Sequence, residues 1–141
     1  MLTGAASAES VASTAGKIWH AAIWEKKQSN WDADIKQYYA TDFNDALAKY
    51  YADSSVQSKV SSIKSNQSNV KDVLSKLQNP PDELKSACDS VNDMYDSYIS
   101  LTNLAVSPSG NYNSFIEKYN SADSDFATQY DKTGTVIPDK K

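Results

Sequence analysis

The sequence contains no arginine: its 14 basic residues are all lysines, set against 18 acidic residues, and the formal net charge is −4. Nucleic-acid recognition depends on a basic face, and the readout of guanine or phosphate favours the guanidinium fork of arginine. We therefore expect no nucleic-acid partner. The sequence also lacks any apolar run of about 18 residues or more, so it predicts no membrane span.

Histidine and cysteine occur once each, as His20 and Cys88. A single cysteine excludes an intramolecular disulfide and a cysteine-based zinc cluster, and one histidine cannot supply the paired Glu-x-x-His motifs of a di-iron bundle. The four glycines form no phosphate-binding loop, and no base accompanies Cys88 or the serines. A haem held by His20 and Met94 remains as a cofactor alternative. The prediction is a protein without catalytic residues, metal or cofactor.

Apolar residues at helical spacing run through most of the chain. The spacing predicts an all-α protein, an up-and-down bundle of four main helices with one additional short helix. The expected helices cover residues 7–28, 43–51, 54–78, 80–105 and 112–130, with a loop at 29–41 that holds one helical turn near 35–39. We expect a flexible N-terminal tether over 1–6, a single helical-bundle domain over 7–131 and a flexible tail over 132–141.

The sequence NPPD, which begins at Asn79, predicts the turn between the two longest helices, with Asn79 as the N-cap and Pro80 in the first helical position. Folded antiparallel about this turn, the two helices bring apolar residues into one register: Leu77 with Leu84, Val70 with Val91, Ile63 with Tyr98, Val60 with Leu101 and Val56 with Ala105. The polar exception is Gln67, which this register places opposite Met94. We expect a tyrosine hydroxyl to satisfy its amide.

Aromatic residues on polar faces are the candidate binding residues. His20 and Trp24 are spaced i, i+4 and face away from the apolar stripe of the first helix. The doublets QYYA and KYYA should leave at least one ring of each partly exposed, and together with Trp31 they predict an aromatic patch beside the loop. The proposed contact residues are His20, Trp24, Trp31, Tyr38 and Tyr39. Local packing against the loop is the competing interpretation for His20 and Trp24.

A second candidate site is a pocket between the helices near Gln67, Tyr95 and Tyr98, with Met94 beside them. Such a pocket would suit a carrier of a small molecule or a peptide. A volume of about 300 Å³ or more, lined by these residues, would favour this alternative.

Several segments resemble small, uncharacterised, helical secreted proteins or lipoproteins of low-GC Gram-positive bacteria: KIWHAAI, SSIKSNQSNV, LQNPPDELKSA, MYDSYISLTNLAVSPSG and NSFIEKYNSADSDF. The resemblance spans roughly residues 17–130, without the loop at 31–39. Leu2-Thr3-Gly4 also resembles the end of a bacterial lipobox, with Ala5 where the lipid-modified cysteine would stand; a chance match in a small-residue N-terminus is equally open.

The resemblance implies an all-helical fold and an extracellular protein, tethered as a lipoprotein in its native form. It supplies no reaction. We therefore expect a non-enzymatic interaction module of the cell envelope that binds a protein or an envelope component. Any membrane contact would come only through an N-terminal lipid anchor.

Overall fold

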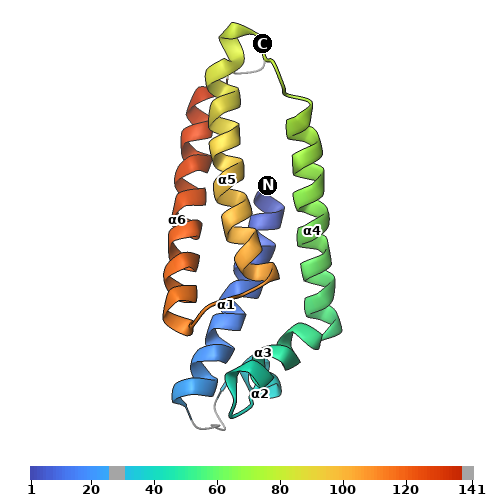
Figure 1. Ribbon diagram of the computed structural model, residues 1–141, viewed down its shortest axis with the longest axis vertical. Helices are drawn as coiled ribbons and strands as arrows, with labels where there is room; N and C mark the ends of the chain where they lie inside the picture. The colour runs from blue at the N-terminus through green and yellow to red at the C-terminus, as the bar shows by residue number, and fades with distance from the viewer. Residues whose placement is uncertain (26–30, 138–141) are drawn as a thin grey trace.

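The computed structural model describes residues 1–25 and 31–137. Within these ranges the chain forms helices and no strand, which confirms the all-α prediction. In chain order the helices are α1 (Leu2–Trp24), α2 (Ala33–Tyr38), α3 (Phe43–Ala52), α4 (Ser54–Ser75), the 3-10 helix η1 (Asp82–Leu84), α5 (Lys85–Val106) and α6 (Tyr112–Val136). Figure 1 shows α1, α4, α5 and α6 along one long axis, with α2 and α3 at one end. None of these helices is both long and apolar enough to cross a membrane.

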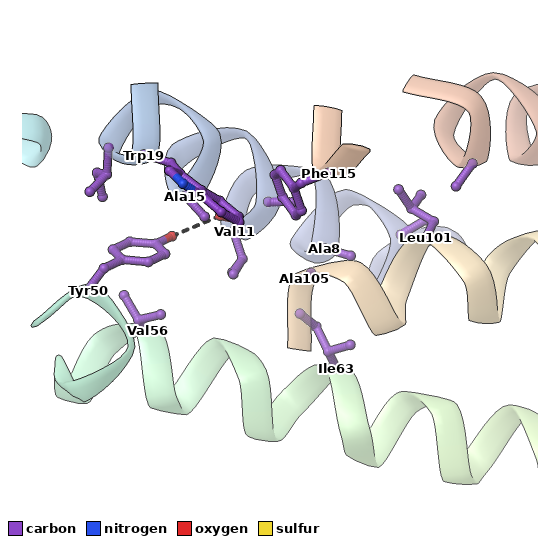
Figure 2. Packing of buried hydrophobic residues seen from close by; sticks show 14 of the residues in the cluster. Ala8, Val11, Ala15, Trp19, Tyr50, Val56, Ile63, Leu101, Ala105 and Phe115 are labelled. Atoms are coloured by element: carbon purple, nitrogen blue, oxygen red, sulfur yellow. Dashed lines mark hydrogen bonds between the residues drawn. The ribbon is translucent and has the colours of Figure 1, made fainter. Parts of the chain in front are cut away.

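Helix α1 is the centre of the fold, because it contacts each of the other five α-helices. Its buried face consists largely of small residues: Gly4, Ala5, Ala8, Ala12, Ala15 and Gly16. Small side chains let neighbouring backbones approach closely, so α1 fits between α4 and α5. Figure 2 shows Ala8 and Val11 of α1 in one core with Ile63 of α4 and with Leu101 and Ala105 of α5.

The pair α5 and α6 forms the longest helix contact of the described chain. Phe115, Ala122 and Phe126 of α6 are buried at steps of seven and four residues, which is the spacing of one helical face. Asn111 begins α6 with a capping box, in which its side chain accepts from the Ser114 backbone N–H at 2.9 Å. Near the other end, the buried hydroxyls of Ser90 and Thr133 lie 3.0 Å apart across the helix pair.

Helix α3 is fixed to the core through two adjacent tyrosines. The Tyr50 hydroxyl donates to the carbonyl oxygen of Val11 at 3.2 Å, and the Tyr51 hydroxyl donates to that of Ala105 at 2.9 Å (Figure 2 draws the first of these bonds). Asp53 then caps α4 by accepting from the Ser55 N–H at 2.8 Å. The hydrogen bond that the Ser55 hydroxyl donates to Asp53 Oδ1 at 2.6 Å lowers the pKa of the Asp53 carboxyl, and the bond from the Ser55 backbone N–H adds to this effect.

Both chain ends differ from the prediction. The tether expected over residues 1–6 is wrong, since α1 begins at Leu2, and Gly4 and Ala5 are buried against the other helices. The tail expected over residues 132–141 is wrong at its start, since α6 continues to Val136 and buries Thr133. Residues 138–141, like residues 26–30 of the predicted first helix and loop, lie outside the described chain.

The predicted turn at the paired prolines is also corrected. Asn79 is not a helix N-cap: its φ of 60° is left-handed, a conformation that asparagine tolerates better than most residues. Neither proline enters a helix, and α5 starts only at Lys85, after the 3-10 turn. A non-helical connection with a turn at 76–77 and bends at 78–79 therefore leads from α4 to the 3-10 turn, and Figure 1 shows α4 ending below the start of α5.

This offset changes which residues of α4 and α5 meet. Gln67 was predicted opposite Met94, but its Nε2 donates to Thr102 Oγ1 at 2.8 Å and to Asn103 Oδ1 at 3.1 Å. Thr102 lies two helical turns further along α5 than Met94. The expectation that a tyrosine hydroxyl satisfies the Gln67 amide is therefore wrong.

Helix α1 packs against both α4 and α5, which keep only a smaller direct contact with each other, so the five predicted apolar pairs do not form one continuous contact. Leu77 and Leu84 remain 45% and 36% exposed. Val70 and Val91 line an open groove that ends at Met1. The predicted contact is buried only near the start of α4 and the end of α5. There Val56, Ile63 and Leu101 share one core with α1.

Gly4 provides a direct test of this close packing. A Cβ at position 4 would collide with the Asn66 Oδ1 and the Tyr98 hydroxyl oxygen, which form a 2.6 Å hydrogen bond over α1. Gly4→Ala should therefore lower the free energy of unfolding by about 1–3 kcal/mol, the usual cost of overpacking. Urea denaturation measures this change.

Gly134→Ala is the matched control, because no described atom lies within 4 Å of a Cβ built there. Alanine is the better helix former, so this variant should gain about 0.5–1 kcal/mol. A Gly4→Ala protein as stable as the wild type would contradict the close approach of α1 to α4 and α5.

Candidate functional site

Three rings from two helices meet where α1 ends and α6 begins. His20 and Trp24 are one turn apart on α1, and their ring centroids lie 5.0 Å apart. Tyr112, the first residue of α6, places its ring 4.8 Å from Trp24 in an edge-to-face arrangement and 5.7 Å from His20. Trp24 nevertheless remains 55% exposed. We call these three residues the aromatic cluster.

Glu25 closes the C-terminal end of α1 beside this cluster. Its Oε1 lies 3.0 Å from His20 Nδ1, with both side chains partly exposed. Its backbone carbonyl accepts from the Tyr39 hydroxyl at 3.4 Å, and the Tyr39 ring packs 5.2 Å from that of Trp31. Glu25 thus connects the end of α1 to the aromatic residues around α2.

A cleft of about 330 Å³ lies between α1, α6 and the segment around α2. Gly16 and Ala12 form part of its lining, and Gly16 leaves room for Ile116, whose Cδ1 would lie 3.1 Å from a Cβ there. The other apolar or aromatic residues that line it are Ala21, Trp31, Ile35, Tyr112, Ile116 and Tyr119. Its polar lining residues are Ser13, Lys17, His20, Glu25 and Asn120. We call it the aromatic cleft.

The predicted contact residues do not all reach this cleft. His20 and Trp31 line it, Trp24 stands beside it in the aromatic cluster, and Tyr39 contacts both Trp31 and Glu25. The prediction that Tyr38 is an exposed contact residue is wrong. Tyr38 is only 7% exposed, and its ring packs 5.1 Å from that of Tyr50 in the core. Tyr38, which α2 turns into the core, is therefore not part of the exposed patch expected from the tyrosine doublets.

Sequence reasoning missed Glu25, Tyr112 and Tyr119. Glu25 carries no helical or motif signal, because its role depends on where α1 ends. Tyr112 follows a recognisable N-cap, Asn111, but the sequence does not indicate that this helix start lies beside the end of α1.

The alternative pocket near Gln67, Tyr95 and Tyr98 is occupied by the protein's own side chains. Tyr98 is fully buried, and its hydroxyl donates to Asn66. Burial, with a smaller effect of Tyr95, raises the pKa of Tyr98 to about 12. Met94 and Tyr95 pack partly buried against the core, and Gln67 bonds to Thr102 and Asn103. These residues hold α4 and α5 together, which disfavours the carrier interpretation.

Comparison with known proteins gave no match to this chain, whether against family models, curated proteins or solved structures. The geometry of the site is therefore the basis for the functional argument.

Two carboxyl groups face each other across α1 and α6 near the aromatic cleft. Burial raises the pKa of Glu9, and the charge of Asp123 and a side-chain hydrogen bond with it add to the shift. Burial also raises the pKa of the cleft residue Tyr119, with further contributions from Asp123 and Glu9. The interface between α1 and α6 therefore disfavours the ionised form of Glu9 relative to solvent.

Stability should depend on pH through Glu9. Because its pKa is higher in the folded state, the stabilisation is complete below the unfolded pKa of about 4.3 and is lost as the pH rises through the raised value. Glu9→Gln removes this loss, so the variant should melt a few degrees above the wild type at pH 7 and close to it at pH 4. Thermal melts followed by circular dichroism measure both differences.

Glu117→Gln is the control, an exposed glutamate on α6. It should shift the melting temperature equally at both pH values. If Glu9→Gln gave no greater gain at pH 7 than at pH 4, the unfavourable carboxyl contact would be refuted.

Proposed function

We propose that this protein is a non-enzymatic, extracellular, helical interaction module of the cell envelope, and that it binds an envelope component at the aromatic cleft. The observation that supports this proposal most strongly is the exposed Trp24, held by His20 and Tyr112 beside a cleft of about 330 Å³. Large exposed aromatic side chains in fixed positions dominate the binding energy of many interfaces.

Rigid positioning is what distinguishes this aromatic cluster from scattered surface residues. The capping box between Asn111 and Ser114 fixes the backbone on either side of Tyr112, and His20 Nδ1 lies 3.0 Å from Glu25 Oε1. The ring of Trp24 therefore has two neighbours that limit its rotation before any ligand arrives. Preorganisation of this kind lowers the entropy lost on binding.

We infer that the four long helices, α1, α4, α5 and α6, form an up-and-down bundle and that the cleft lies at one end of it. The support is that α1 and α5 run opposite to α4 and α6 in Figure 1, with α1 packed among the other three. In such a bundle the end of α1 and the start of α6 lie at the same end, beside α2 and α3.

An extracellular location is the second part of the proposal. Its support is the resemblance of the sequence to secreted proteins and lipoproteins of Gram-positive bacteria. A lipid anchor at position 5 would require a local change of structure, because Ala5 of α1 is only 1% exposed. A lipid-modified residue there would leave the core, and the first turn of α1 would unwind with it.

Binding to intact cell-wall material tests the proposal. Purified Gram-positive sacculi, sedimented after incubation with the protein, should retain the wild type. Trp24→Ala should weaken the apparent affinity for sacculi by about tenfold, the equivalent of one lost aromatic contact of roughly 1.4 kcal/mol, and so lower the fraction retained at subsaturating sacculi. The retained protein is quantified on a gel.

Tyr130→Ala provides the matched control, since Tyr130 is also an exposed aromatic residue, 45% exposed, towards the far end of α6. It should be retained like the wild type. Equal retention of the Trp24→Ala protein, or no retention of the wild type, would contradict binding of an envelope component at this cleft.

A further inference from the structure

We infer that the ligand of the aromatic cleft is a neutral, hydroxylated ring, that is, a sugar residue of a glycan. This inference rests on the proposed function and specifies the chemical class of its ligand. Three properties of the described lining residues carry it: aromatic and apolar side chains, hydrogen-bonding groups of both kinds and balanced charge.

Aromatic and apolar side chains line the cleft on two sides. Trp31 approaches from the segment before α2, and Tyr112 and Ile116 approach from α6. Trp31 is held against Tyr39 at 5.2 Å, so its ring orientation is fixed by the protein. Aromatic rings of this kind pair an apolar face with a polar edge, which suits a sugar ring with C–H groups on its faces and hydroxyls around its rim.

The polar lining supplies both donors and acceptors. The Lys17 ammonium only donates, the Glu25 carboxylate only accepts, and the Asn120 amide does both. A carboxylate has about four acceptor positions, and the bond to His20 uses one of them. A sugar hydroxyl both donates and accepts, so it can satisfy either kind of neighbour, whereas a phosphate cannot donate to Glu25 once it is fully ionised.

The charge of the cleft favours a neutral ligand. Among the described lining residues, Lys17 is the one permanent cation and Glu25 the one carboxylate, while His20 is charged only when protonated. An organic cation would gain from the aromatic walls but would be repelled by Lys17, and a phosphate would be repelled by Glu25. A neutral ring meets neither penalty.

Calorimetric titration of the full chain tests this inference. The probes are tetra-N-acetylchitotetraose and maltotetraose as neutral glycans, with choline chloride and sodium phosphate as charged comparators at equal ionic strength. At least one of the two glycans should bind and change the tryptophan fluorescence. Trp31→Ala and Glu25→Gln should each weaken that binding by about tenfold or more.

The controls separate binding from folding. Trp31→Phe keeps an aromatic ring and should restore most of the affinity, while Tyr130→Ala and Glu117→Gln should bind like the wild type. Circular dichroism melts show whether each variant is folded.

The outcomes distinguish this inference from the proposed function. If neither glycan binds but sacculi still retain the wild type through Trp24, the sugar inference is refuted and the envelope-binding proposal stands. If neither glycan binds and sacculi retain nothing, both are refuted. Stronger binding of choline or phosphate, abolished by Trp31→Ala, would also overturn the neutral-ring inference.

Discussion

The close approach of α1 to α4 and α5 is the interaction on which the rest of the structure depends. Glycine and alanine residues on its buried face bring these backbones together, and the bond from Tyr98 to Asn66 crosses over Gly4. Helix α4 is rich in serine and asparagine, which cost up to about 0.7 kcal/mol each relative to alanine in a helix. With only Val56 and Ile63 fully buried on α4, its stability depends on the contact with α1.

The same helix determines the candidate site. Because α1 runs through the core, its last two turns emerge beside the start of α6, and this places Trp24 against Tyr112. The small residues that allow close packing also shape the aromatic cleft, since Gly16 lets Ile116 approach and adds no side chain to fill the space. The core and the cleft therefore depend on one face of one helix, and a substitution there would affect both the stability of the protein and the shape of the cleft.

Helix positions follow from the sequence, but the partners of the helices do not. Apolar spacing predicts α3, α5 and most of α4, because burial of one face leaves a periodic signal. The same spacing on α4 cannot show whether its apolar face meets α5 or α1. A run of small residues at the N-terminus is equally typical of a flexible tether and of a closely packed helix. Of the site, His20, Trp24 and Trp31 are visible as unusual residues, whereas Glu25 and Tyr112 depend on how helix ends meet in space.

Native-state hydrogen exchange, measured residue by residue by NMR, tests the central position of α1 most directly. Amides of α1 around Ala8–Ala15 should exchange only through global unfolding, as slowly as those of α5 near Leu101. Amides of α4 beyond Val70, where it lines an open groove, should exchange faster. Uniform protection along α4 and α5, with faster exchange in α1, would show that the contact between α4 and α5 does not depend on α1 and that α1 lies outside the core.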